Sequence, residues 1–154
     1  ILVAVAIMLA TVHLSRTEDG PVDDTVTVGF VLDEGGQLNF SCQVADDHPE
    51  RVEGLQHREE LDEGSGMLFV FDEPTHVYFI MPNMNFPLDI IFIGENGTVL
   101  NVAEAEPEEP GTPSTEYVRY PSDGRAKWVV EINQGICRQH GIGPGTRLVL
   151  EAGD

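Results

Sequence analysis

One polar stretch, residues 81–89, interrupts an apolar part of the chain and holds side chains that could bind a ligand. It carries two methionine thioethers, two asparagine amides and, where the next apolar run begins, the carboxylate of Asp89. A loop between two buried strands is a frequent binding site, because the rigid scaffold fixes the positions of its side chains. We expect Asn83, Met84 and Asn85 to be the residues of this loop that meet a ligand.

Two carboxylates, Asp89 and Glu131, lie within strand-like apolar runs. A buried carboxylate is costly without a partner, and Arg58 or backbone N–H groups of residues 82–86 are the partners that we expect for Asp89. Such a pairing would fix the loop. Alternatively, Asp89, or Glu131 at an outward-facing strand position, could act as a general acid or base. Glu104 could join both carboxylates in a site for a hard cation.

Motifs for metal or cofactor chemistry are missing from the sequence. Met67, Met81 and Met84 could present thioethers to Cu(I), but no histidine lies in the loop and methionines of this kind usually pack in cores. The five histidines show no metal-ligand spacing, and no nucleophile elbow, phosphate loop or dinucleotide fingerprint is present. We predict no metal and no cofactor, we assign no catalytic residue, and we favour a binding domain over an enzyme.

The charge balance excludes one class of partner. The 154 residues include 27 acidic and 8 basic side chains, and the formal net charge of -19 repels phosphate backbones. We therefore predict that the protein does not bind nucleic acid. Lys127 is the single lysine, and the acidic residues are spread along the whole chain. Because molar salt shortens the Debye length to about 3 Å, this composition indicates an acidic, halophilic protein.

The chain is long enough for one domain preceded by a leader. Residues 1–14 form an apolar run that predicts a signal peptide or a membrane anchor, and residues 15–25 form an acidic linker before the domain of residues 26–152. Either leader places the domain outside the cytoplasm, membrane-anchored or secreted. In that compartment Cys42 and Cys137 could form one disulfide or remain two buried thiols.

The apolar patterning predicts a compact, mainly β domain, an antiparallel sandwich or barrel of about eight strands with two short helices. We expect strands at 25–32, 37–44, 67–71, 77–81, 88–93, 98–103, 126–132 and 147–151, and helices from about 46 to 60 and from 134 to 140. The first helix would bury Val52 and Leu55, and Asn133 would cap the second. Residues 94–97 predict a hairpin turn, where Asn96 is a candidate glycosylation site.

Several motifs, in a fixed order, resemble the DUF192 family, a domain of unknown function. They are Arg51-x-x-Gly54-Leu55-x-x-Arg58, the apolar run 66–71, Phe79-x-Met81-x-Asn83-Met84-x-x-Pro87-Leu88-Asp89-Ile90-Ile91-Phe92-Ile93, Tyr120-Pro121-Ser122, Trp128-Val129-Val130-Glu131 and Gly135 with His140-Gly141-Ile142-x-Pro144-Gly145. The resemblance covers roughly residues 38–150. It implies a compact, mainly β domain with a couple of helices, often exported, that has no established biochemical activity.

The acidic composition is similar to that of haloarchaeal members of the family, many of which carry an N-terminal signal or anchor. The sequence departs from the family at three positions. Ile80 stands where many relatives have tryptophan, Pro82 where many have lysine or arginine, and Ala103 where many have histidine. These differences oppose any chemistry that would need a histidine or a basic residue of the loop.

Three functions remain in competition. The first is a non-enzymatic, membrane-tethered domain that binds a small ligand, a cation or an envelope partner through the 81–89 loop. The second is a hydrolase-type enzyme, which requires Asp89 and Glu131 to converge on one pocket. The third is an inert structural or assembly module, which predicts a sizeable exposed apolar patch. For the first, the candidate ligand-binding residues are Arg58, Asn83, Met84, Asn85, Asp89 and Glu131.

Overall fold

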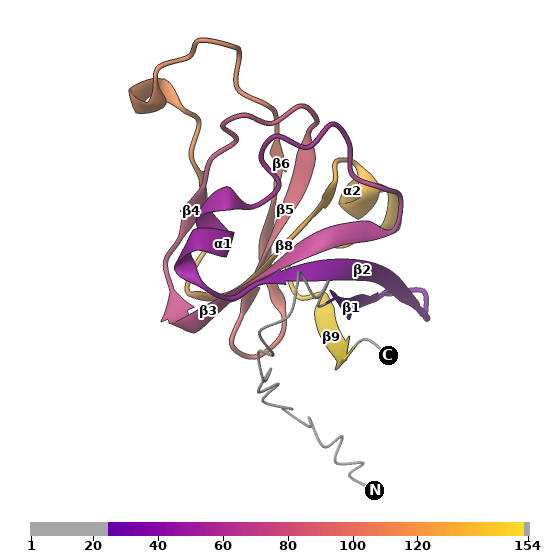
Figure 1. Ribbon diagram of the computed structural model, residues 1–154. Helices are drawn as coiled ribbons and strands as arrows, with labels where there is room; N and C mark the ends of the chain where they lie inside the picture. Colours follow the sequence, from indigo (N-terminus) through magenta and orange to yellow (C-terminus); the bar gives the residue numbers. More distant parts are fainter. Residues whose placement is uncertain (1–24, 153–154) are drawn as a thin grey trace, which may run out of the picture.

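The computed structural model describes residues 25–152, in which a seven-stranded sheet curls around an apolar core (Figure 1). The strands are β1 (Thr25–Val31), β2 (Gln37–Ala45), β3 (Ser65–Thr75), β4 (Tyr78–Phe79), β5 (Leu88–Gly94), β6 (Val99–Ala105), β7 (Tyr120–Pro121), β8 (Ala126–Asn133) and β9 (Arg147–Ala152). Two short α-helices, α1 (His48–Glu53) and α2 (Ile136–His140), and a 3₁₀ turn, Ser114–Glu116, complete the described elements. The predicted leader and nearly all of the linker lie outside the described residues. Within residues 25–152 no helix is both long and apolar enough to cross a membrane.

The large sheet has the strand order β6-β5-β8-β3-β2-β1-β9. Its neighbours are antiparallel except for β2 and β3, which run parallel. The two edge strands meet at one end, where the Val99 N–H donates to Thr146 O (2.8 Å) and the Leu148 N–H to Gly97 O (2.9 Å). The prediction of a mainly β, compact fold is confirmed, and the curled sheet resembles a half-barrel more than a sandwich. The described residues contain one strand more than the eight that the sequence predicted, namely the short β7, which pairs with β4.

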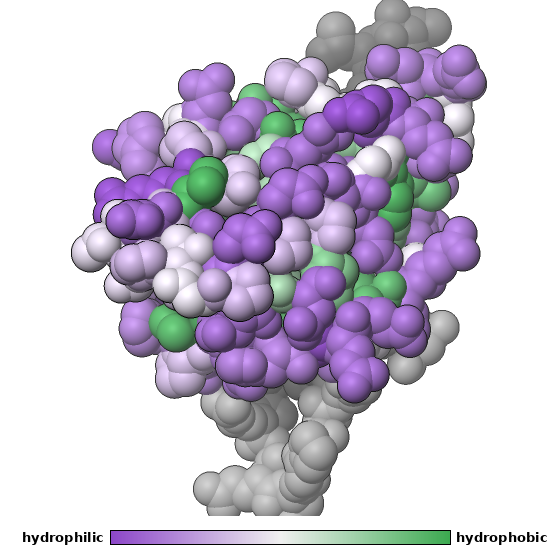
Figure 2. Space-filling model, turned by 90° about the horizontal axis from the view of Figure 1, so that it is seen from above, coloured by the Kyte–Doolittle hydropathy of each residue, from purple (hydrophilic) through white to green (hydrophobic). Residues whose placement is uncertain are grey.

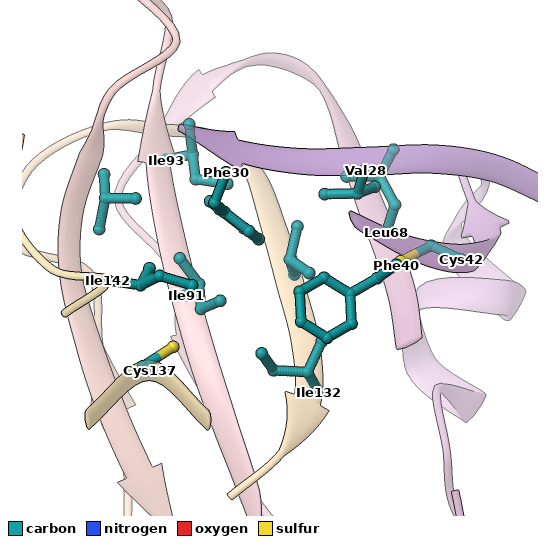
Figure 3. Packing of buried hydrophobic residues seen from close by; sticks show 12 residues of the cluster. Val28, Phe30, Phe40, Cys42, Leu68, Ile91, Ile93, Ile132, Cys137 and Ile142 are labelled. Atoms are coloured by element: carbon teal, nitrogen blue, oxygen red, sulfur yellow. The ribbon is translucent and has the colours of Figure 1, made fainter. Parts of the chain in front are cut away.

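Both faces of the sheet are buried, so two apolar cores form. The inner core contains large side chains such as Phe30, Phe40, Ile91 and Ile132, and the α2 segment covers it with Cys137 and Ile142 (Figure 3). The outer core lies beneath α1, the residues that follow it and the β4–β7 pair, and it contains Leu55, Phe69, Met81, Leu88 and Phe92. Strand β5 crosses the centre and is buried along its whole length. Because both faces of this strand are covered, all of its residues except Asp89 are apolar or glycine.

The two cysteines are free thiols in the inner core. Cys42 comes from β2 and Cys137 from α2, and Figure 3 shows their sulfur atoms apart from each other. Burial raises the pKa of the Cys42 thiol to about 12, and burial, followed by the neighbouring Asp89 carboxylate, raises that of Cys137 further. Of the two alternatives that the sequence left open, the structure contains the two buried thiols.

Helix α1 begins as predicted but is shorter. Asp47 and Glu50 form a reciprocal capping box, and a proline occupies the first turn. The helix ends at Gly54, whose φ of 51° lies in the left-handed region. The expected continuation to about residue 60 is therefore wrong, and so is the inward placement of Val52, whose exposed fraction is 60%. Leu55 is buried as expected, because the chain turns back onto the sheet after Gly54.

The single lysine stabilises an irregularity in the sheet. The pairing of β3 with β8 shifts register between Val70 and Thr75, which leaves backbone groups of this region without a partner from the ladder. The Lys127 ammonium donates hydrogen bonds to the carbonyl oxygens of Phe71 (2.6 Å) and Asp72 (3.0 Å). The single lysine of the chain therefore has a structural role, because it bonds backbone carbonyl groups at this irregularity.

We predict that Lys127→Met lowers the free energy of unfolding by about 1–2 kcal/mol, because two carbonyl oxygens lose a charged donor. Denaturant unfolding at constant high salt measures the change. The control is Arg125→Met, which removes the same charge from an exposed side chain with no hydrogen bond in the described structure. Equal effects of the two substitutions would show that charge, rather than the carbonyl contacts, is responsible.

Candidate functional site

Asp89 lies in the inner face of β5 and holds the start of α2. Its Oδ2 accepts the backbone N–H of Gly135 at 3.1 Å and that of Cys137 at 2.9 Å, and its exposed fraction is 0%. Gly135, the N-cap residue of α2, has no side chain to bond these donors, so the carboxylate from β5 supplies the cap. Its Oδ1 has no hydrogen-bond partner among the described residues.

The expected partners of Asp89 are wrong. Arg58 lies on the other side of the sheet, and the N–H donors come from residues 135–137 instead of the 82–86 loop. Asn133, the expected cap of α2, donates its side-chain amide to Leu61 O at 2.8 Å. Sequence spacing does not reveal either contact, because both join segments far apart along the chain.

Glu131 lies in the outer face of β8, with an exposed fraction of 5%. Cross-strand pairing places it between Met67 of β3 and Ile90 of β5. Burial raises the pKa of its carboxyl group from 4.5 to about 8, so the group is mostly protonated at neutral pH. The expectation that Glu131 faces outward to solvent is wrong, because a second apolar layer covers this face of the sheet.

The carboxylates do not converge on one pocket. Asp89 of β5 pairs with Ile132 of β8, and the adjacent pair of this antiparallel ladder is Ile90 with Glu131. Because neighbouring strand residues point to opposite faces, the two carboxylates are separated by the sheet. Glu104 forms an ion pair with Arg138 near the surface. Within residues 25–152, no group of three or more acidic, histidine or cysteine side chains is placed to hold a metal ion.

The 81–89 loop is attached to the segment after α1 by three hydrogen bonds. The His57 N–H donates to Asn83 O (3.0 Å), the Asn83 side-chain amide to Gln56 Oε1 (2.8 Å), and the Asn85 side-chain amide to Arg58 O (2.6 Å). Met84 packs against the outer core. The candidate residues of the loop therefore position the segment that carries Arg58, and that segment faces a pocket.

This pocket, with a volume of about 300 Å³, lies over β2 and β3. Its lining is mostly polar and comprises Thr25, Ser41, Gln43, Arg58, Glu60, Leu61, Asp62, Ser65 and Gly66. The sheet contributes hydroxyl and amide side chains, and the segment 58–62 contributes one cation and two carboxylates. Arg58 donates through Nη2 to Gln43 Oε1 at 2.6 Å, which joins the two walls.

Of the predicted ligand-binding residues, only Arg58 lines this pocket. Asn83, Met84 and Asn85 are not among its lining residues, and Asp89 and Glu131 are buried on opposite faces of the sheet. Ser41, Gln43 and Ser65 were missed. The alternation of β2 could have revealed two of them. Phe40 and Cys42 face the inner core, so Ser41 and Gln43 face the opposite side of the sheet. Asn96 lies exposed in the β5–β6 turn, where its Oδ1 accepts from Thr98, and its glycosylation stays a prediction.

The DUF192 family model, described as an uncharacterized ACR, matches residues 30–150. No curated protein matches the chain. A proposed transcription regulator from Sinorhizobium meliloti 1021 is 28% identical, with a TM-score of 0.74, and the match covers 85% of this chain and 98% of that chain. A protein of unknown function from Novosphingobium aromaticivorans DSM 12444 is 31% identical, also with a TM-score of 0.74, and the match covers 88% of this chain and 93% of that chain.

We predict that Asp89→Ala lowers the free energy of unfolding by about 3–4 kcal/mol, because two buried N–H groups lose a charged acceptor. Denaturant unfolding measures the loss, and amide hydrogen exchange at Gly135 and Cys137 should accelerate. Glu104→Ala is the control, since it removes an exposed ion pair of the same helix and should cost less than about 1 kcal/mol. Unchanged exchange at both amides would contradict the capping role.

We predict that Glu131 makes stability fall as pH rises from about 5 to 9. Its pKa in the folded protein, about 8, exceeds the ordinary 4.5, so the folded state holds a proton that the unfolded state has released. The contribution of this proton to the free energy of unfolding is complete below pH 4.5 and is lost as the pH rises through about 8. Over this range Glu131→Gln should gain stability relative to the wild type by on the order of 3 kcal/mol. Parallel pH profiles of unfolding for the two proteins would contradict it.

Proposed function

This chain belongs to the DUF192 family, and we propose that its domain is a non-enzymatic binding module that holds a small polar ligand in the pocket beside Arg58. The polar lining of this cavity of about 300 Å³ is the observation that carries the proposal. Small-molecule pockets begin at about this volume, and their few placed polar groups set specificity. Hydroxyl, amide, guanidinium and carboxylate groups from two walls suit a ligand with several hydrogen-bonding groups.

The 81–89 loop has an indirect part in this function. Its asparagines donate hydrogen bonds to Gln56 and Arg58, and in this way they hold the segment that carries Arg58. The ligand would therefore contact Arg58 and the polar side chains of β2 and β3, while Asn83 and Asn85 act as positioning residues.

We place this function outside the cytoplasm, in a membrane-anchored or secreted protein similar to haloarchaeal members of the family. The apolar run of residues 1–14 supports the location, and the net charge of -19 with a single lysine supports a saline environment. The partner is a small molecule, with an envelope protein as the alternative. The relative named as a proposed transcription regulator suggests nucleic acid, but this charge would repel it.

The geometry gives less support to the other two functions. A hydrolase would need Asp89 and Glu131 in one pocket, and they lie on opposite faces of the sheet. An assembly module would need a large apolar surface. Within residues 25–152, the large exposed apolar residues are Val52 of α1, Tyr78 of β4, Leu150 of β9, and Ile80 and Val118, which lie outside the helices and strands. On the face seen in Figure 2, apolar residues appear as separate spots among hydrophilic ones.

A thermal-shift screen of the full chain at high salt tests the proposal, with sugars, amino acids, short peptides and divalent cations as probes. We expect at least one polar small molecule to raise the Tm. Ser41→Phe, which fills the pocket from an exposed position of β2, should abolish that shift. Asn39→Phe, at an exposed position of the same face outside the pocket, should keep it. No shift with any probe, or a shift that survives Ser41→Phe, would refute the proposal.

A further inference from the structure

The guanidinium of Arg58 lines the pocket without an ion-pair partner among the described residues. Its one side-chain hydrogen bond goes to the neutral amide oxygen of Gln43. Other arginines are engaged differently: Arg51 donates to the carbonyl oxygens of Asp46 and Val70, and Arg138 pairs with Glu104. Since a guanidinium has five N–H donors, Arg58 retains donors for a bound anion.

The backbone around Arg58 is held in place before any ligand binds. His57 and Asn83 have φ angles of 65° and 53°, in the left-handed region that non-glycine residues seldom adopt. The hydrogen bond from the His57 N–H to Asn83 O joins these two positions, and Asn85 bonds the carbonyl oxygen of Arg58 itself. Backbone strain tends to gather where a binding group must be kept in position. Preorganisation of this kind lowers the cost of ordering on binding.

The same pocket contains charge of the opposite sign. Glu60 and Asp62 line it, and neither forms an ion pair with Arg58 in the part of the chain that the structure describes. Ser41 and Ser65, at paired positions of β2 and β3, add neutral hydroxyl groups to the lining. The pocket therefore offers a cation and two carboxylates that do not neutralise each other directly.

We propose that the ligand is a small zwitterion, a free α-amino acid, with its carboxylate on Arg58 and its ammonium group facing Glu60 and Asp62. This inference rests on the function proposed above and names its ligand class. A guanidinium binds a carboxylate through two parallel N–H donors, a geometry that a neutral acceptor such as Gln43 does not complete. A volume of about 300 Å³ suits one amino acid better than a longer peptide.

Other ligand classes leave charges without partners. A simple anion would satisfy Arg58 but meet the repulsion of Glu60 and Asp62, and a metal cation would meet the repulsion of Arg58. A neutral sugar would leave the guanidinium and both carboxylates unpaired. A ligand with both charges matches the lining best, because each of its charges meets the opposite charge and neither meets a like charge alone.

Isothermal titration of the full chain tests this, at the lowest salt at which the chain remains folded. The probes are glycine, L-alanine, L-serine and L-glutamine, with propionate and ethylamine as analogues of alanine that lack one charged group. We expect an amino acid to bind at least tenfold more tightly than propionate or ethylamine. Arg58→Gln and the double variant Glu60→Gln/Asp62→Asn should each weaken amino acid binding at least tenfold. Arg125→Gln, an exposed arginine outside the pocket, should not.

The analogues keep the test decisive if a pocket variant fails to fold, because they need no substitution. Binding of propionate or ethylamine as tight as that of alanine would overturn the zwitterion proposal. A different result would be that a sugar or metal ion binds, that Ser41→Phe abolishes this binding, and that no amino acid binds. This result would overturn the present inference and leave the proposed function standing. Absence of binding by every probe would overturn both.

Discussion

The carboxylate of Asp89 connects the central strand β5 to helix α2. It comes from the most deeply buried strand, β5, and it bonds the first N–H groups of α2, the helix that covers the open side of the curled sheet. A helix of five residues cannot stabilise itself by its own hydrogen bonds, so its place depends on this contact and on the burial of Cys137. A charged group in the core is tolerated here because backbone donors surround one of its oxygens.

The second constraint is that both faces of the sheet are covered. The outer layer consists of short or irregular segments, and each needs hydrogen bonds to the sheet or to its neighbours to stay in place. The bonds of Asn83 and Asn85 to residues 56–58, and of Asn133 to Leu61, provide them. The polar pocket lies where this layer ends, at Ser41 and Ser65, where the outer core gives way to hydroxyl groups.

Local signals predicted most of the fold. Strand alternation and the Gly-rich hairpin turn at 94–97 are each contained within a few residues, and the structure has both. Predictions that needed the second layer were wrong: the alternation of β8 places Glu131 on a second face correctly, but it does not say that this face is covered. Likewise, the partner of Asp89 is 46 residues away in the sequence. The pocket escaped prediction because serine and glutamine in a strand usually indicate only a solvent-facing side.

The start of the domain has a geometric consequence for its use. Thr25, the first residue of β1, lines the pocket and pairs with Gln43 of β2, so the chain enters the domain at the rim of its binding site. In the anchored form proposed above, residues 15–25 are the whole tether. Fully extended, this segment spans at most roughly 40 Å. The pocket of an anchored molecule would then sample only a thin layer of solvent next to the bilayer, and its ligand would have to be present there.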